Sequence, residues 1–262
     1  VKKLLREVPT INKVYVSCDT EIPQFIKELY PMYKHKEPQE LNFEKETSRE
    51  EVKRQGNILH ELLPTLQIVS VRLQCNEADD IIAAFCSKVK DQRVLILSTD
   101  HDYYQLITNK VVVFNGIKEQ IITENDLELK NKRYLQYRVL SGDSSDNLPG
   151  IKGIGSKTAL DILQKYNSIE EYLKYGKQNK IYQSVLSNMD YINNVSKVID
   201  LINILEYQPH LDNYVSTILE KTFSPSMDNY KVFQQFCFKN QFLSILENMK
   251  LWYENFIRIN TE

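Results

Sequence analysis

Residues 140–166 read LSGDSSDNLPGIKGIGSKTALDILQKY, and the interpretation of the whole chain starts from this stretch. Asp143 and Asp146 stand three positions apart in a turn rich in Ser and Asp. Several glycines follow, with Lys152 among them, and a helix is predicted to begin at Ser156, whose hydroxyl would cap it. Such glycines allow tight turns in which consecutive N–H groups face an anion, and the helix N-terminus adds partial positive charge. The stretch therefore predicts a phosphate-binding turn.

The glycines of this turn, Gly150, Gly153 and Gly155, form the pattern G-x-x-G-x-G. The pattern is neither a dinucleotide-binding fingerprint nor a P-loop, because no hydrophobic strand precedes it and no Gly-Lys-Ser/Thr closes it. An ordinary glycine-rich turn between two helices is the alternative. The longer pattern GDSSDN-x-PG-x-x-GIG-x-KTA closely resembles the helix–three-turn–helix of the 5′-nuclease family, a motif of the helix–hairpin–helix type. That family contains flap endonucleases and the 5′→3′ exonucleases of phages and of bacterial DNA polymerases.

Composition places the chain among globular proteins. It has 262 residues, of which 42% are hydrophobic and 26% charged. The net charge of −2 does not exclude a nucleic acid partner, because the acidic residues can be gathered in one site. No apolar run reaches membrane-spanning length and no signal peptide opens the chain, so we expect a soluble, cytoplasmic protein. The four cysteines form no C-x-x-C pair, which favours free thiols, and the four histidines show no metal-ligand spacing.

The first half of the chain has the pattern of an α/β domain. Short strands are predicted near residues 14–16, 68–73, 94–97 and 111–114, with helical stretches between them. This alternation predicts a doubly wound, mostly parallel sheet. Ligands bind outside the carboxyl ends of the strands in such sheets, so carboxylates that follow the strands should gather there. Those carboxylates are Asp19, Glu77, Asp79, Asp80, Asp100 and Asp102.

Two acidic segments extend the resemblance to the family. E-A-D-D at residues 77–80 follows Asn76, which is predicted to cap a helix, and S-T-D-x-D-x-x-Q-L occupies residues 98–106. Acidic residues in a first helical turn also act as ordinary partners of the helix dipole, which would account for one or two of them. Both segments match signatures of the 5′-nucleases, whose α/β lobe is PIN-like.

The segment that follows Asp19 matches the family at one basic position and differs at two. Lys34 corresponds to the lysine that faces the scissile phosphate, whereas Ile26 and Glu37 stand where the family has basic residues. The family's first strand, which ends in Asp-Gly-x-Asn and carries a metal ligand, does not precede Asp19. Because the sequence begins with Val1, we expect a fragment, or a protein whose first segment is encoded or cut separately.

Residues 37–56 are polar and charged, and two interpretations stay open for them. They form either a solvated helix face or, as the resemblance implies, part of a mobile helical arch at about residues 34–60. An apolar helical patch over residues 59–66 is expected to end at Pro64.

The pattern becomes helical after Asn125. We therefore predict an α/β nuclease lobe over residues 1–126 and a helical DNA-binding lobe over residues 127–262. The helix–three-turn–helix would lie at about residues 135–166.

Seven or eight carboxylates cannot converge in ionised form without cations, because like charges raise their pKa and unpaired buried charge is costly. Ligands that are all oxygen favour Mg²⁺ or Mn²⁺ over zinc. Two ions roughly 4 Å apart would activate water and stabilise the leaving oxygen of an in-line displacement. The sequence therefore predicts a site for two divalent ions.

The resemblance implies a role for each residue. Asp19, Glu77 and Asp79 would bind chiefly the first ion, and Asp79, Asp100, Asp102 and Asp143 the second, with Asp19, Asp100 and Asp102 taking part in catalysis. Asp80 and Asp146 would be the additional acids of the bacterial and phage branch. Lys34 would stabilise charge on the phosphate. A duplex phosphate, with K⁺ as a candidate further ion, would bind at the glycine turn of Gly150, Lys152, Gly153, Gly155, Ser156 and Lys157.

The predicted function is thus a divalent-metal-dependent 5′ nuclease that hydrolyses phosphodiesters in branched or 5′-ended DNA during replication or repair. It would act as a monomer in the cytoplasm of a bacterium or of a phage's host. The first alternative is a structure-selective DNA-binding protein of the same fold that is impaired in cutting, because the first Asp is missing and Ile26 replaces an arginine. The second is an RNA-cutting relative, although such relatives lack the glycine turn.

Overall fold

A computed structural model describes residues 11–35, 43–66, 68–221 and 227–257. The chain divides into two compact units. Unit 1 consists of residues 1–18, 38–73 and 220–262, and unit 2 consists of residues 19–37 and 74–219. None of the described helices is long and apolar enough to cross a membrane.

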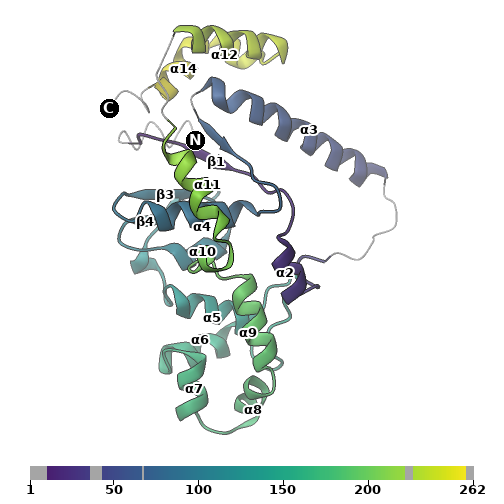
Figure 1. Ribbon diagram of the computed structural model, residues 1–262, viewed down its shortest axis with the longest axis vertical. Coiled ribbons are helices and arrows are strands. Elements are labelled where there is room, and N and C mark those ends of the chain that lie inside the picture. Colours follow the sequence, from purple (N-terminus) through teal and green to yellow (C-terminus); the bar gives the residue numbers. More distant parts are fainter. Residues whose placement is uncertain (1–10, 36–42, 67, 222–226, 258–262) are drawn as a thin grey trace. The chain divides into compact units, whose positions relative to one another are not determined.

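The described residues of unit 1 form a small parallel sheet and four helices (Figure 1). Strand β1 (Tyr15–Ser17) pairs in parallel with β2 (Val69–Val71), with Tyr15 opposite Val69. The helices are α3 (Phe43–Thr65), α12 (Met227–Lys239), α13 (Leu243–Glu247) and α14 (Met249–Ile257). Apolar side chains from both ends of the sequence form its core, which contains Leu63, Leu66, Ile68, Phe233, Cys237, Met249 and Tyr253.

Unit 2 contains a three-stranded sheet in the order β3-β4-β5. Strand β3 (Val94–Leu97) runs parallel to β4 (Val111–Asn115), and β4 pairs antiparallel with β5 (Gln120–Ile122). Helix α4 (Ala78–Lys88) buries one apolar face, including Ile81, and packs against α10 (Ile204–Tyr207) and α11 (His210–Leu219). The 3₁₀ helix η1 (His101–Leu106) follows β3 and contacts both α4 and β4.

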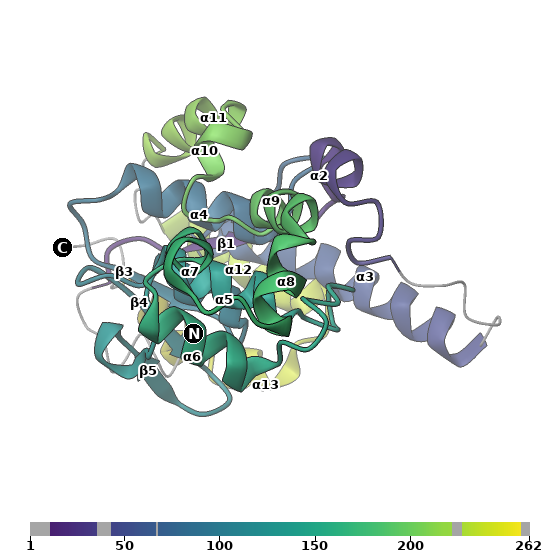
Figure 2. The same cartoon turned by 90° about the horizontal axis from the view of Figure 1, so that it is seen from below.

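The remaining helices of unit 2 share one apolar core, which includes the fully buried Val139, Leu140 and Leu163. Figure 1 shows α5 to α9 grouped together, and Figure 2 shows the same group from below. These helices are α2 (Gln24–Leu29), α5 (Lys132–Ser141), α6 (Ser156–Lys165), α7 (Ile169–Tyr175), α8 (Lys180–Leu186) and α9 (Met189–Val198). The 3₁₀ helix η2 (Glu124–Asp126) precedes α5 and has no buried residue.

The loop between α5 and α6 closes on itself through backbone contacts. Asp143 and Leu148 exchange two backbone hydrogen bonds of 2.7 Å, and the Ile151 amide donates to the Leu140 carbonyl at 2.9 Å. Gly142 and Gly150 both have positive φ, +76° and +67°, where a side chain is disfavoured. A Cβ atom on Gly150 would lie 2.6 Å from the amide nitrogen of Gly142. The two glycines therefore allow two backbone segments to meet.

Most predicted elements are present, with differences in the sheet and at three helix ends. The described strands form two separate sheets where one continuous sheet was predicted, and the antiparallel β5 was not predicted. The strand predicted at residues 94–97 is present as β3, and its last residue, Leu97, is 44% exposed. Three predictions of helix ends were wrong: Glu77 and not Asn76 is the N-cap of α4, Gly155 and not Ser156 is the N-cap of α6, and Pro64 lies inside α3.

These three errors have simple physical reasons. Asn76 is buried and its amide is used elsewhere, as described below. Ser156 is already the first helical residue of α6, and no side chain caps this helix. Pro64 removes a single backbone donor one residue before the helix ends at Thr65, so little further hydrogen bonding is lost. Residues 36–42 of the proposed arch lie outside the described residues.

We predict that Gly150→Ala lowers the free energy of unfolding by roughly 2 kcal/mol or more, because it places a Cβ at positive φ against backbone atoms. Gly155→Ala is the matched control, since a Cβ there meets nothing within 4 Å and its φ is −91°. Urea unfolding of both variants measures the difference. Equal stability of the two variants would contradict the argument.

Candidate active site

The first group of acids surrounds the N-terminal end of α4. Glu77 is the N-cap, Asp79 and Asp80 lie in the first turn, and Asp80 Oδ2 accepts from the Glu77 amide at 3.4 Å. Asp19 joins them from a distant part of the sequence, because its Oδ1 accepts a 2.8 Å hydrogen bond from the Ala78 amide. Four carboxylates therefore meet at a helix end whose amide dipoles favour negative charge.

Lys34 is the cation of this group. Its Nζ lies 2.5 Å from Glu77 Oε1. Burial lowers the pKa of Lys34, but the attraction of Glu77, with smaller contributions from Asp79 and Asp146, raises it overall. The backbone of Lys34 has a positive φ of 50°, and its amide donates to the Asp146 carbonyl at 2.9 Å. Lys34 thus joins the helix α4 acids to the loop that carries Asp146.

The second group of acids lies beyond β3. Asp100 is the N-cap of η1, and its Oδ1 accepts from the Asp102 amide at 2.9 Å. Asp100 is exposed, whereas Asp102 is buried. Capping by Asp100 fixes the direction in which Asp102 leaves the turn.

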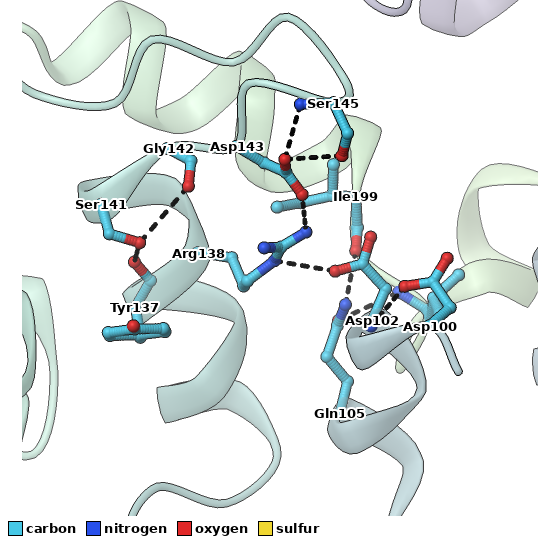
Figure 3. Close-up of polar contacts among 11 residues, drawn as sticks. Asp100, Asp102, Gln105, Tyr137, Arg138, Ser141, Gly142, Asp143, Ser145 and Ile199 are labelled. Atoms are coloured by element: carbon cyan, nitrogen blue, oxygen red, sulfur yellow. Dashed lines mark hydrogen bonds and ion pairs between the residues drawn. The ribbon is translucent and has the colours of Figure 1, made fainter. Parts of the chain in front are cut away.

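Arg138 on α5 connects this group with the loop after α5. Its Nε donates to Asp102 Oδ1 at 2.8 Å, and a terminal nitrogen donates to Asp143 Oδ2. Figure 3 shows the guanidinium group between the two carboxylates. Asp143 Oδ1 also accepts from the amide and the hydroxyl of Ser145, at 2.8 and 2.6 Å. Arg138 was not predicted from the sequence, since nothing in its neighbourhood distinguishes it from a surface arginine.

Most acids of this region are buried or half-buried and lie near other acids, and both effects raise the pKa of their carboxyl groups. The pKa values of Glu77, Asp79, Asp80 and Asp146 are raised, with burial as the largest cause in each case. Burial also raises the pKa of Asp102 to about 6, although Arg138 opposes this effect. The pKa of Asp143 is lowered by its hydrogen bonds with Ser145 and Arg138, which outweigh burial. A cation that approached the four carboxylates with raised pKa values would therefore be bound favourably.

All eight predicted acids belong to unit 2, and hydrogen bonds or electrostatic interactions link each of them to another member of the site. Among the described residues, however, no three of these side chains converge closely enough to form a ready metal-binding group. The donor set still fits a hard divalent ion. Mg²⁺ keeps several of its waters and binds directly through one or two carboxylates, so it needs no dense cluster.

The glycine turn lies on the loop that carries Asp143 and Asp146, a few residues beyond Asp146. Gly153 has a positive φ of 87°, and Lys152, Gly153, Gly155, Ser156 and Lys157 are all exposed. Within the described parts of the chain, the amides of Lys152, Gly153 and Gly155 have no hydrogen-bond partner. The Gly150 amide is used internally, because it donates to the Tyr191 hydroxyl at 3.1 Å. The turn therefore offers exposed amide donors to an anion.

A buried polar network behind α4 was also missed by sequence reasoning. The side-chain amide of Asn76 donates to Gln208, and Asn76 Oδ1 lies 3.1 Å from His210 Nε2. Asn76 and Gln208 are 1% and 2% exposed. Their side chains lower the pKa of Asp80, although burial, the larger effect, raises it. No sequence signal links residues so far apart, and only the fold brings them together.

Comparison with known proteins identifies the family. The description "5′-3′ exonuclease, N-terminal resolvase-like domain" matches residues 1–132, and "5′-3′ exonuclease, C-terminal SAM fold" matches residues 129–221. The chain belongs to the 5′-3′ exonuclease family. This result confirms the predicted membership of the 5′-nucleases and the predicted fold class, an α/β domain followed by a helical one.

Two curated relatives show the extent of the similarity. The chain is 34% identical to a thermostable DNA polymerase I of Thermus thermophilus over 166 residues, which are 62% of this chain and 19% of that one. It is 33% identical to a 5′-3′ exonuclease of Aquifex aeolicus over 154 residues, 56% of this chain and 50% of that one. The chain thus spans about a fifth to a half of the length of these relatives.

A solved structure shares the fold. The T5 D15 protein co-crystallised with metal ions aligns with a TM-score of 0.75 at 20% identity, covering 84% of this chain and 87% of that chain.

We predict that the metal-free protein, kept in a chelator, loses stability as the pH rises between about 4 and 6. The raised pKa of Asp102, about 6, means that the folded chain holds a proton that the unfolded chain has released in this window, so rising pH favours unfolding. Melting temperatures across this range measure the effect. The decline should be weaker in Asp102→Asn and unchanged in Asp190→Asn, an exposed acid on α9. An unchanged decline in Asp102→Asn would refute the assignment.

Proposed function

We propose that this chain is a divalent-metal-dependent 5′ nuclease that hydrolyses phosphodiesters in branched or 5′-ended DNA, in replication or repair. The observation that carries the proposal is that two acids of the site and the exposed glycine turn share one short loop. Asp143 and Asp146 begin this loop and Gly150 to Gly155 end it. One segment can therefore place an acidic cutting site near an amide-lined phosphate site.

The eight acids would hold Mg²⁺ or Mn²⁺, in our proposal two ions, through the residues Asp19, Glu77, Asp79, Asp80, Asp100, Asp102, Asp143 and Asp146. When bound, such ions supply an activated water and stabilise charge on the leaving oxygen. The raised pKa values of the buried acids support this assignment, since they indicate a site that favours added positive charge.

The other residues bind and orient the DNA. Lys34 stands beside Glu77 and would place its positive charge near the phosphate to be cut. The amides of Lys152, Gly153 and Gly155, with the side chains of Ser156 and Lys157, would hold a phosphate of the duplex without contacting bases. K⁺ at this turn is part of the proposal. A monomer acting in the cytoplasm of a bacterium or of a phage's host fits these roles.

We further propose that the functional division lies at residues 126–127, between an α/β nuclease lobe and a helical DNA-binding lobe. The two family descriptions meet at residues 129–132, which supports this division.

Asp100→Asn is predicted to reduce Mg²⁺-dependent cleavage of a 5′-flap DNA by roughly a hundredfold, because it removes a charge from the acidic site but keeps the η1 cap. Asp91→Asn is the control, since Asp91 is an exposed acid that precedes β3, whereas Asp100 follows it. Binding of the flap without any cleavage by the unmodified chain would favour the non-cutting alternative. Faster cleavage of an RNA flap than of the matched DNA flap would favour the RNA-cutting alternative.

Lys152→Ala is predicted to weaken duplex binding by a similar factor for different sequences and to lower the slope of log affinity against log salt by about 1. Lys118→Ala removes an exposed lysine from the turn between β4 and β5 and serves as the control. The expectation fails if the two variants bind alike in a salt titration.

A further inference from the structure

Arg138 is held rigidly at the centre of the second acidic group. It lies on α5 between turns that bury Leu135 and Val139 in the core of unit 2, so its Cα atom is fixed. The side chain of Arg138 is 14% exposed, and those of Asp102 and Asp143 are 9% and 16% exposed. All three groups are therefore largely removed from water.

The two contacts use different nitrogens of one planar group. Nε donates to Asp102 and a terminal nitrogen donates to Asp143 (Figure 3). A guanidinium group has its donors in a fixed arrangement, so it sets both the spacing and the orientation of the carboxylates that it binds. Asp143 comes from a loop and Asp102 from η1, and Arg138 is the side chain that joins them.

The contacts also occupy the oxygens that an incoming ion would need. Asp143 Oδ2 accepts from Arg138, and Asp143 Oδ1 accepts twice from Ser145. A divalent ion that binds this carboxylate must share or replace these donors, and it must approach a fixed positive charge.

We propose that Arg138 is a positioning residue that acts as the resident counter-cation of Asp102 and Asp143. It holds the pair together before a divalent ion binds, but its positive charge opposes that ion more strongly than this placement helps it, so Arg138 lowers the affinity of the pair for the ion. The inference rests on the proposed function, which brings divalent ions to these acids.

The experiment measures Mn²⁺ binding by calorimetry to the full chain without DNA. Arg138→Gln is expected to bind Mn²⁺ about tenfold more tightly than the unmodified chain, because one positive charge next to the ion is removed. A purely structural ion pair gives the opposite result, since its loss disorders the acids and weakens ion binding. Arg133→Gln is the control, because it removes the same charge from α5, and Arg133 has no acidic partner among the described residues.

Unchanged or weaker Mn²⁺ binding by Arg138→Gln overturns the proposal. If that variant does not fold without ions, Arg138→Gln combined with Asp143→Asn keeps the charge of the group constant and is compared with Asp143→Asn alone. The double variant is expected to bind Mn²⁺ more tightly, and equal or weaker binding overturns the proposal. Absence of Mn²⁺ binding in every variant and in the unmodified chain contradicts the proposed function itself, which keeps the two failures distinct.

Discussion

Repulsion between carboxylates is the interaction on which the arrangement of unit 2 depends. Glu77 is the N-cap of one helix and Asp79 and Asp80 lie in its first turn, and burial removes the water that would screen them. Two cationic side chains, Lys34 and Arg138, form ion pairs with acids of this unit, and each lies on a helix or in a tight turn. Neither cation neutralises its whole group, and this remaining shortage of positive charge favours the approach of a further cation.

The loop after α5 holds two of these acids in fixed positions. Gly142 and Gly150 lie against each other, so the segment between them is a closed turn with fixed ends. Arg138 and Lys34 hold one side of this turn, through Asp143 and the backbone of Asp146. The exposed amides of the glycine turn begin where the closed segment ends. A phosphate bound there would therefore lie only a few residues along the chain from Asp143 and Asp146, with no flexible linker between them.

The sequence was sufficient for features that depend on local chemistry. Glycine spacing predicted the turn, and acids that follow predicted strands identified the region where Asp100 and Asp102 lie. Features that depend on long-range packing could not be predicted in this way. Arginine usually lies at the surface, and the partner of Arg138, Asp102, is 36 positions away in the sequence. The cap at Asn76 was predicted wrongly for the same reason, because its buried partner Gln208 is 132 positions away.

That distant partner also explains why α10 and α11 matter, although their sequence indicates little more than amphipathic helix. Gln208 lies between these two helices, and His210 begins the second one. Both contact Asn76, the residue immediately before the N-cap of α4, and Lys88 at the other end of α4 pairs with Asp212 at 2.9 Å. A buried amide costs free energy unless it is hydrogen-bonded, so the contacts of Asn76 with Gln208 and His210 favour a single placement of α4 against these helices. The acids of the first turn are positioned by that placement, which makes a stretch remote in sequence part of the support of the site.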